Sequence, residues 1–267
     1  MLSGKRTVFR QHFGEGACAT DEAICFIAEN LSGKKTKLCL GVNMDSVFFC
    51  LEILGVTAFS ISGALVAIKS KFDLFGVVVA GVTTAVGGGI TRDILVDQLP
   101  PKIFYNQHLI FISVLTALLT FVFAYVKRSK FSIIESKIEA INNYFDAIGL
   151  AVFTVMGVET TINYGYGDNF LLSISMGALT GVGGGLMRDI FTSSKPSIFT
   201  KHVYAVASII GAITFYVLRI NFALTTISIL AGVFIIFVLR VTATKYRWEL
   251  PKAHIDEDDA TGDKGKL

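Results

Sequence analysis

Charged residues are scarce through most of this chain. Between Ser46 and Arg240 there are only 13 lysines and arginines and 10 aspartates and glutamates, most of them in short clusters between apolar runs. A soluble domain has no need of apolar runs as long as these, whereas a run of about 18 or more apolar residues is typical of a membrane span. The scarcity of charge therefore indicates a protein that crosses the membrane several times.

Other features are missing as well, and each absence excludes a class of protein. The apolar runs lack the period-two alternation of a transmembrane β-barrel, so we expect helices, which satisfy their own backbone hydrogen bonds in lipid. The net charge of +3 is not gathered on one basic face, which argues against a nucleic-acid partner. No phosphate-binding loop, nucleophile elbow or Cys/His metal set is present. We therefore expect no enzyme, no cofactor and no metal site.

The apolar runs predict an all-α fold of seven transmembrane helices. These helices are expected at about 46–68, 72–89, 108–126, 138–162, 170–186, 199–218 and 222–239. The predicted division of the chain is a polar N-terminal tail at 1–43 with Met44 as an alternative start, a first repeat at 44–130, a second repeat at 131–219, a seventh helix at 220–240 and a charged C-terminal tail at 241–267.

Positive charge is uneven on the two sides of these spans. One side carries 11 lysines and arginines in short loops, namely Lys69, Lys71, Lys127, Arg128, Lys130, Lys137, Lys195, Lys201, Arg240, Lys245 and Arg247. The other side carries five, namely Lys34, Lys35, Lys37, Lys102 and Arg219. Since cytoplasmic loops are the more positive, we expect a cytoplasmic C-terminus and an external N-terminus.

The chain repeats itself. When it is shifted by 96 residues, 81–95 falls on 177–191 with nine of 15 positions identical, including a Gly-Gly-Gly-x-x-Arg-Asp motif in each copy. A shift of 94 places 52–63 on 146–157, again with matching glycines and a matching phenylalanine. Each copy contains three spans, and an odd number of crossings inverts the second copy across the membrane. Inverted repeats are typical of transport proteins, whose functional path lies where the copies meet.

The glycine triplets predict interrupted helices. Three glycines loosen a helix, and the end of a half-helix carries a partial charge that can hold an ion. The plainer alternative is that the glycines only allow two helices to pack closely.

The Arg-Asp pairs lie at membrane depth, where a charge is costly and either pairs or faces water. Because adjacent residues on a helix point in different directions, we expect pairs between copies, Arg92 with Asp189 and Arg188 with Asp93. Glu52 and Asp146 are competing partners, and a purely structural clamp is the alternative. The candidate permeation residues are Gly87, Gly88, Gly89, Arg92, Asp93, Gly183, Gly184, Gly185, Arg188 and Asp189, and the candidate lining or supporting residues are Glu52, Ser60, Asp146 and Thr154.

These motifs resemble a known family. Two copies of an acidic-x-x-Gly-x-x-x-Phe-[Ser/Thr]-x-x-Gly helix, each followed by a Gly-Gly-Gly-x-x-Arg-Asp helix, are similar to the bacterial relatives of the TRIC (trimeric intracellular cation) channels, also labelled as a glycine-transporter domain family. The resemblance covers about 44–240. It implies an inverted three-plus-three repeat with a seventh helix, a homotrimer embedded in lipid, a pore in each protomer and passive permeation of monovalent cations, chiefly potassium.

Two other functions stay open on the residues alone. A secondary transporter would use the helix ends to hold a small amino acid such as glycine. A membrane scaffold would use the same motifs for packing only.

Overall fold

The computed structural model describes residues 44–126, 135–194, 196–200, 203–222, 225–246 and 248. The predicted N-terminal tail lies outside the described residues. So does most of the predicted C-terminal tail, although the last long helix continues six residues into it, as far as Tyr246. Every regular element in the described ranges is helical.

Seven helices are long and apolar enough to span a membrane, which confirms the predicted fold class. They are α3 (Met44–Lys69), α4 (Leu74–Leu95), α5 (Gln107–Val126), α7 (Glu135–Thr161), α8 (Phe170–Phe191), α10 (Tyr204–Phe222) and α11 (Thr225–Tyr246). Three short helical segments connect them, namely η1 (Lys102–Phe104), η3 (Ile162–Tyr166) and α9 (Ser197–Thr200).

The predicted interruption of the second and fifth spans is wrong. α4 continues through its three glycines to Leu95, and α8 continues through its own to Phe191. Glycine disfavours a helix by only about 1 kcal/mol per residue, and close packing against a neighbouring helix offsets a cost of that size. Both are therefore full-length spans of 22 residues, with no half-helix end inside the membrane.

The two copies begin these helices in the same way. The side chain of Asp73 accepts a hydrogen bond from the backbone N–H of Gly76 at 2.7 Å. In the second copy, the Asn169 side chain accepts one from Leu172 at 3.0 Å. Such N-caps satisfy backbone donors that the first helical turn leaves free. The repeat thus extends beyond the glycine motif to the local signal that starts each helix.

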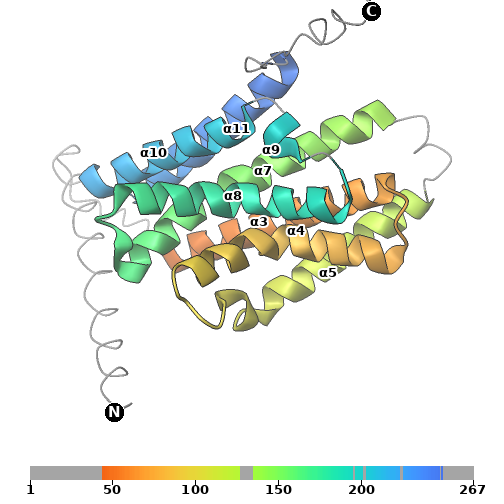
Figure 1. Cartoon of the computed structure of the whole chain (residues 1–267), viewed down its shortest axis with the longest axis horizontal. Coiled ribbons are helices and arrows are strands. Elements are labelled where there is room, and N and C mark those ends of the chain that lie inside the picture. The colour runs from red at the N-terminus through yellow and green to blue at the C-terminus, as the bar shows by residue number, and fades with distance from the viewer. Residues whose placement is uncertain are drawn as a thin grey trace, which may run out of the picture.

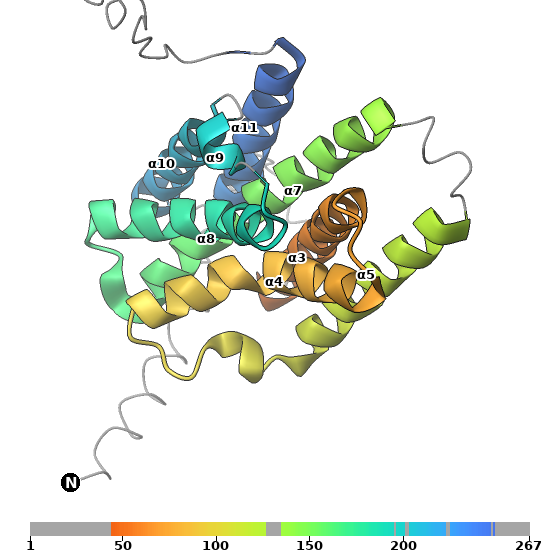
Figure 2. The same ribbon diagram turned by 45° about the vertical axis from the view of Figure 1, so that its right-hand side comes forward.

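The helices form two three-helix units with α11 added to the second. Figure 1 shows α4 and α8 side by side and running in opposite directions, as an inverted repeat requires. Figure 2 shows α3, α4 and α5 on one side of this junction and α7, α8, α10 and α11 on the other. We call the end where α3 finishes the Lys69 end of the molecule, and the end where α4 finishes the Leu95 end.

Large apolar side chains cover the outside of the bundle. On α5, Phe111, Leu115, Leu119 and Phe123 recur every four residues and are each more than half exposed. A stripe of this kind is unfavourable in water and favourable against lipid tails. α5 is the least buried of the seven spans and α7 the most buried.

The interior contact between the copies is symmetric. Phe59 of α3 stacks on Phe153 of α7 with ring centroids 5.2 Å apart, and the two residues correspond in the repeat. A side chain added at Gly149 would overlap the Phe59 ring, and one added at Gly55 would press on Phe153 at 3.1 Å. Each phenylalanine therefore packs in the space left by a glycine of the other copy.

Candidate functional site

The glycine triplets meet where α4 crosses α8. A Cβ added at Gly88 would overlap the carbonyl oxygen of Thr180, and one added at Gly184 would overlap the carbonyl oxygen of Thr84. The backbones are therefore in direct contact, with no room for any side chain. The close-packing alternative explains these two glycines better than the predicted interruption does.

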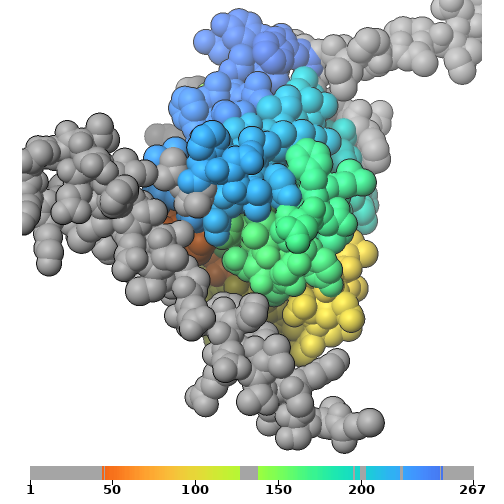
Figure 3. Space-filling view, turned by 90° about the vertical axis from the view of Figure 1, so that its left-hand side faces the viewer, coloured from red at the N-terminus to blue at the C-terminus, as the bar shows by residue number. Residues whose placement is uncertain are grey.

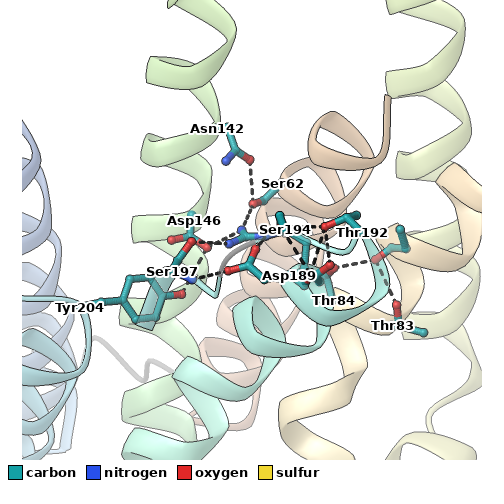
Figure 4. A network of polar contacts seen from close by, with 12 residues as sticks. Ser62, Thr83, Thr84, Asn142, Asp146, Asp189, Thr192, Ser194, Ser197 and Tyr204 are labelled. Carbon is teal, nitrogen blue, oxygen red and sulfur yellow. Dashed lines mark hydrogen bonds and ion pairs between the residues drawn. The ribbon is translucent and has the colours of Figure 1, made fainter. Parts of the chain in front are cut away.

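Beyond the crossing, toward the Lys69 end, lies a buried polar cluster around Arg188. Its guanidinium donates to Asp189 (Nε to Oδ1, 2.8 Å) and to Asp146 (Nη1 to Oδ1, 2.7 Å). Nη1 also lies 2.6 Å from the hydroxyl oxygen of Ser62, which in turn donates to the side-chain carbonyl of Asn142. Figure 4 shows the partner side chains Ser62 of α3, Asn142 and Asp146 of α7 and Asp189 of α8 converging on one point. Arg188 is 1% exposed, so its charge is held entirely by protein groups.

Asp146 collects a second set of donors. The hydroxyl of Tyr204 donates to it at 3.3 Å, and Nη2 of Arg240 lies 3.5 Å from its other oxygen. The Arg240 guanidinium also stacks over the Tyr204 ring, 4.4 Å from the centroid. Among the described residues, the cluster thus contains two arginines and two aspartates, whose formal charges balance. Balance and multiple hydrogen bonds are what allow charges to be buried in an apolar interior.

The corresponding cluster of the first copy, toward the Leu95 end, is simpler. Arg92 donates to Asp93 through Nε at 2.9 Å and through Nη2 at 2.7 Å. Glu52 is the repeat counterpart of Asp146. Yet it accepts no hydrogen bond from any residue in the described ranges, and it lies in the field of Lys102, Arg92 and two further groups. Figure 3 looks onto this end, where the segment around η3 (green) lies beside the α4–α5 connection (yellow).

The predicted pairs between copies are wrong, because each arginine binds the aspartate that follows it. The cause is the position of the motif at the end of its helix. Asp93 directs Oδ2 to the backbone N–H of Lys102 at 2.9 Å, and Asp189 directs Oδ2 to that of Ser197 at 2.6 Å. Each aspartate thereby holds the loop after its helix, and the long arginine side chain folds back to the remaining oxygen. Asp146 was correctly expected as a partner for an arginine of the motif.

A pocket of about 370 Å³ opens at the Lys69 end and reaches Arg188 and Asp189. Its walls come from the end of α3, the start of α7 and the connection between α8 and α9. The charged cluster around Arg188 therefore forms the inner boundary of a cavity that is open to the outside at this end.

The hydroxyl candidates are placed between helices. Ser60 is buried and donates to the carbonyl of Ser113 at 2.7 Å, which ties α3 to α5. Thr154 is fully buried, and a Cβ added at Gly181 would overlap its hydroxyl. Neither side chain lines the pocket. In the described ranges no group of three His, Cys, Asp or Glu residues is placed to hold a metal ion.

Comparison with known proteins extends these observations. The family model described as "Glycine transporter" matches twice, at residues 49–125 and 143–219. The UPF0126 inner membrane protein YadS of Escherichia coli K12 is 35% identical over 214 residues, which is 79% of this chain and 98% of that protein. The UPF0126 membrane protein of Vibrio cholerae is 34% identical over 77% of this chain and 82% of its own length.

Solved structures of similar proteins have the same fold. The TRIC trimeric intracellular cation channel orthologue from Rhodobacter sphaeroides superposes with a TM-score of 0.68 at 28% identity, over 76% of this chain and 99% of that one. A second TRIC cation channel, solved to explain conductance, superposes with a TM-score of 0.68 at 33% identity, over 79% and 98%. This chain belongs to the bacterial TRIC-type family. These neighbours are channels rather than enzymes, in line with the lack of a catalytic motif.

Sequence reasoning missed several members of the TRIC-type site. Arg240 was counted among loop cations, but α11 continues past it and leaves it 1% exposed. Tyr204 carried no distinguishing pattern in the sequence. Glu159 is also buried, and it accepts a hydrogen bond from Arg219 at 3.1 Å. The sequence did contain one signal for Arg240, because this arginine directly follows a long apolar run.

Proposed function

We propose that this protein is a monovalent cation channel of the bacterial inner membrane, conducting chiefly potassium as a homotrimer with one pore in each protomer. The observation that carries the proposal is the likeness to solved TRIC cation channels over almost their whole length. The trimer is supported by the description of one of these relatives as trimeric. The permeation residues we propose are the ten of the two glycine motifs, among which Gly88 and Gly184 act by fixing the contact between α4 and α8, with Glu52 and Asp146 in support.

The charges of the site are compatible with passage of a cation. An unpaired arginine on the path would repel cations, but Arg92 is bound by Asp93, and Arg188 by Asp146 and Asp189. Toward the Leu95 end, Glu52 adds a carboxylate that Lys102 balances in formal charge. Because these arginines and Lys102 are each balanced by a carboxylate, the path presents no excess positive charge to a passing cation.

We also propose that the Lys69 end faces the cytoplasm. The excess of lysine and arginine lies at that end, and it persists when the buried Arg240 is left out of the count. In this orientation the pocket is an inner vestibule and Glu52 belongs to an outer one. We further propose that the two repeats, 44–130 and 131–219, are the structural units on either side of the path.

Recording from purified protein in planar bilayers tests the channel. We expect unitary currents that reverse at the potassium equilibrium potential in a potassium gradient. Cross-linking of the same sample should give a trimer. Purified, folded protein that stays electrically silent contradicts the channel.

Neutralising the outer carboxylate is expected to weaken conduction without closing the pore. Glu52→Gln leaves Lys102 unbalanced, so unitary potassium conductance should fall severalfold at low salt and recover in about 1 M salt, where the screening length is only about 3 Å. Asp168→Asn is the matched control, because it removes an exposed carboxylate at the same end of the bundle. An equal loss in both variants would mean that Glu52 has no special place on the path.

A secondary transporter of a small amino acid is the second candidate, favoured by the description of the family model. It predicts saturable glycine uptake into proteoliposomes and no unitary currents. The two experiments therefore separate the candidates, and a scaffold would give neither signal.

A further inference from the structure

The two copies of the site differ in one respect that the repeat does not explain. The Lys69-end cluster receives a side chain from α11, which lies outside the repeat, whereas no described helix outside the repeat contributes to the Leu95-end cluster. Asp146 has three donor groups from three helices, while its counterpart Glu52 has none in the described ranges. The acidic residues at the two ends of the proposed path are thus held by unequal numbers of described hydrogen-bond donors.

We propose that Arg240 is a positioning residue that acts through Asp146 to keep the path closed at the Lys69 end, which we call the inner mouth. This inference rests on the proposed channel function and concerns its gating.

The geometry favours this role for three reasons. Asp146 is shared, because one oxygen binds Arg188 and the other faces Arg240. Arg240 is fixed in place, because its guanidinium lies on the Tyr204 ring and its side chain is 1% exposed. Arg188 closes the inner end of the pocket while bound to the same Asp146. Asp146 thus links Arg188, at the inner end of the pocket, to Tyr204 of α10 and Arg240 of α11, so a movement of Arg188 would disturb α7, α8, α10 and α11 together.

Charge gives the direction of the effect. Asp146 and Asp189 balance Arg188 and Arg240. Loss of Arg240 removes one positive charge from a buried site, which makes the site more negative and favours entry of water and cations. The closed mouth should become less stable relative to the open one.

The test is single-channel recording of Arg240→Met, which keeps the length of the side chain and removes its charge. We expect the ratio of open to closed time to rise about tenfold, the lower range for a hydrogen bond to a charged group, with unitary conductance unchanged. Arg240→Lys keeps the charge but loses the planar stacking on Tyr204, so it should restore part of the closed time. Lys245→Met is the matched control, because it removes an exposed cation from the same helix.

Two results would overturn the inference. An unchanged open-to-closed ratio in Arg240→Met would show that the residue holds nothing closed. An altered unitary conductance at an unchanged ratio would make it part of the conducting path instead. If Arg240→Met gives no folded protein, Tyr204→Phe tests the same point, because it removes one donor to Asp146 and keeps the ring, and a smaller rise in the ratio is expected.

A second measurement does not require a conducting pore. Ser62 is fully buried and is hydrogen-bonded to Arg188 and Asn142, two residues that line the pocket. In a background with the four native cysteines replaced by serine, Ser62→Cys should react with a membrane-impermeant thiol reagent from the cytoplasmic side about ten times faster when Arg240→Met is added. Wild-type protein without currents would refute the proposed channel function but not the role of Arg240. An unchanged labelling rate would refute the role of Arg240 but not the channel function.

Discussion

Gly88→Ala is expected to prevent stable folding, whereas Gly89→Ala, one residue later in the same triplet, is expected to be tolerated. The added methyl group at Gly88 would overlap the Thr180 carbonyl and would lie 3.2 Å from the backbone nitrogen of Gly184. These are backbone atoms of another helix, so relief requires α4 and α8 to separate. At Gly89 the nearest atom, apart from the backbone of its own helix, is the end of the Arg92 side chain at 4.0 Å.

The expected cost at Gly88 is about 3 kcal/mol or more, since overpacking that moves backbone lies at the upper end of the range for added methyl groups. Gly89→Ala should be neutral, or should stabilise by up to about 1 kcal/mol through helix propensity. Thermal melting of the purified protein, followed by size-exclusion chromatography, measures both. Gly184→Ala, which meets the Thr84 carbonyl and the Phe59 ring, should behave like Gly88→Ala. Equal melting of Gly88→Ala and Gly89→Ala would contradict the direct backbone contact.

The contrast between these two glycines marks a limit of sequence reasoning. The repeat, the seven spans and their inverted arrangement followed from patterns that the sequence contains in register. Gly88 and Gly89 are the same residue type, so the sequence could not show that Gly88 contacts another helix and Gly89 does not. Helix continuity through the triplet was missed for the same reason, because the packing that compensates for three glycines comes from α8, far away in the chain.

The polar site was predictable only in part. The motif arginines and Asp146 stood out because charge is rare in apolar runs. Their pairing depended on where each helix ends, and the rule that neighbouring residues point apart failed at that end. Arg240 was misplaced because the seventh span was expected to finish at 239, one residue before it. The asymmetry between Asp146 and Glu52 could not be inferred from a repeat that places acidic residues at both positions.

That asymmetry leads to the second large effect. Asp146→Asn is expected to destabilise the protein by about 3–5 kcal/mol, because it removes a buried carboxylate that both Arg188 and Arg240 face, and breaking a buried pair from one side has a cost of that order. Glu52→Gln is the matched control supplied by the repeat itself. Since no described residue donates to Glu52, its loss should change stability by less than about 1 kcal/mol. Thermal melting of the two variants in the same detergent gives the comparison.

A double variant separates charge balance from lost hydrogen bonds. Asp146→Asn combined with Arg240→Met returns the cluster to one arginine and one aspartate, so it should be more stable than Asp146→Asn alone. Substitutions of residues that share one network are expected to have non-additive effects on stability. If the double variant is instead less stable by the sum of the two single effects, Arg240 and Asp146 act independently, and the buried cluster is not held together by its balance of charge. Recovery in the double variant would mean that α11 contributes an obligatory counter-charge to the second copy, which makes this helix part of the site rather than an addition to the repeat.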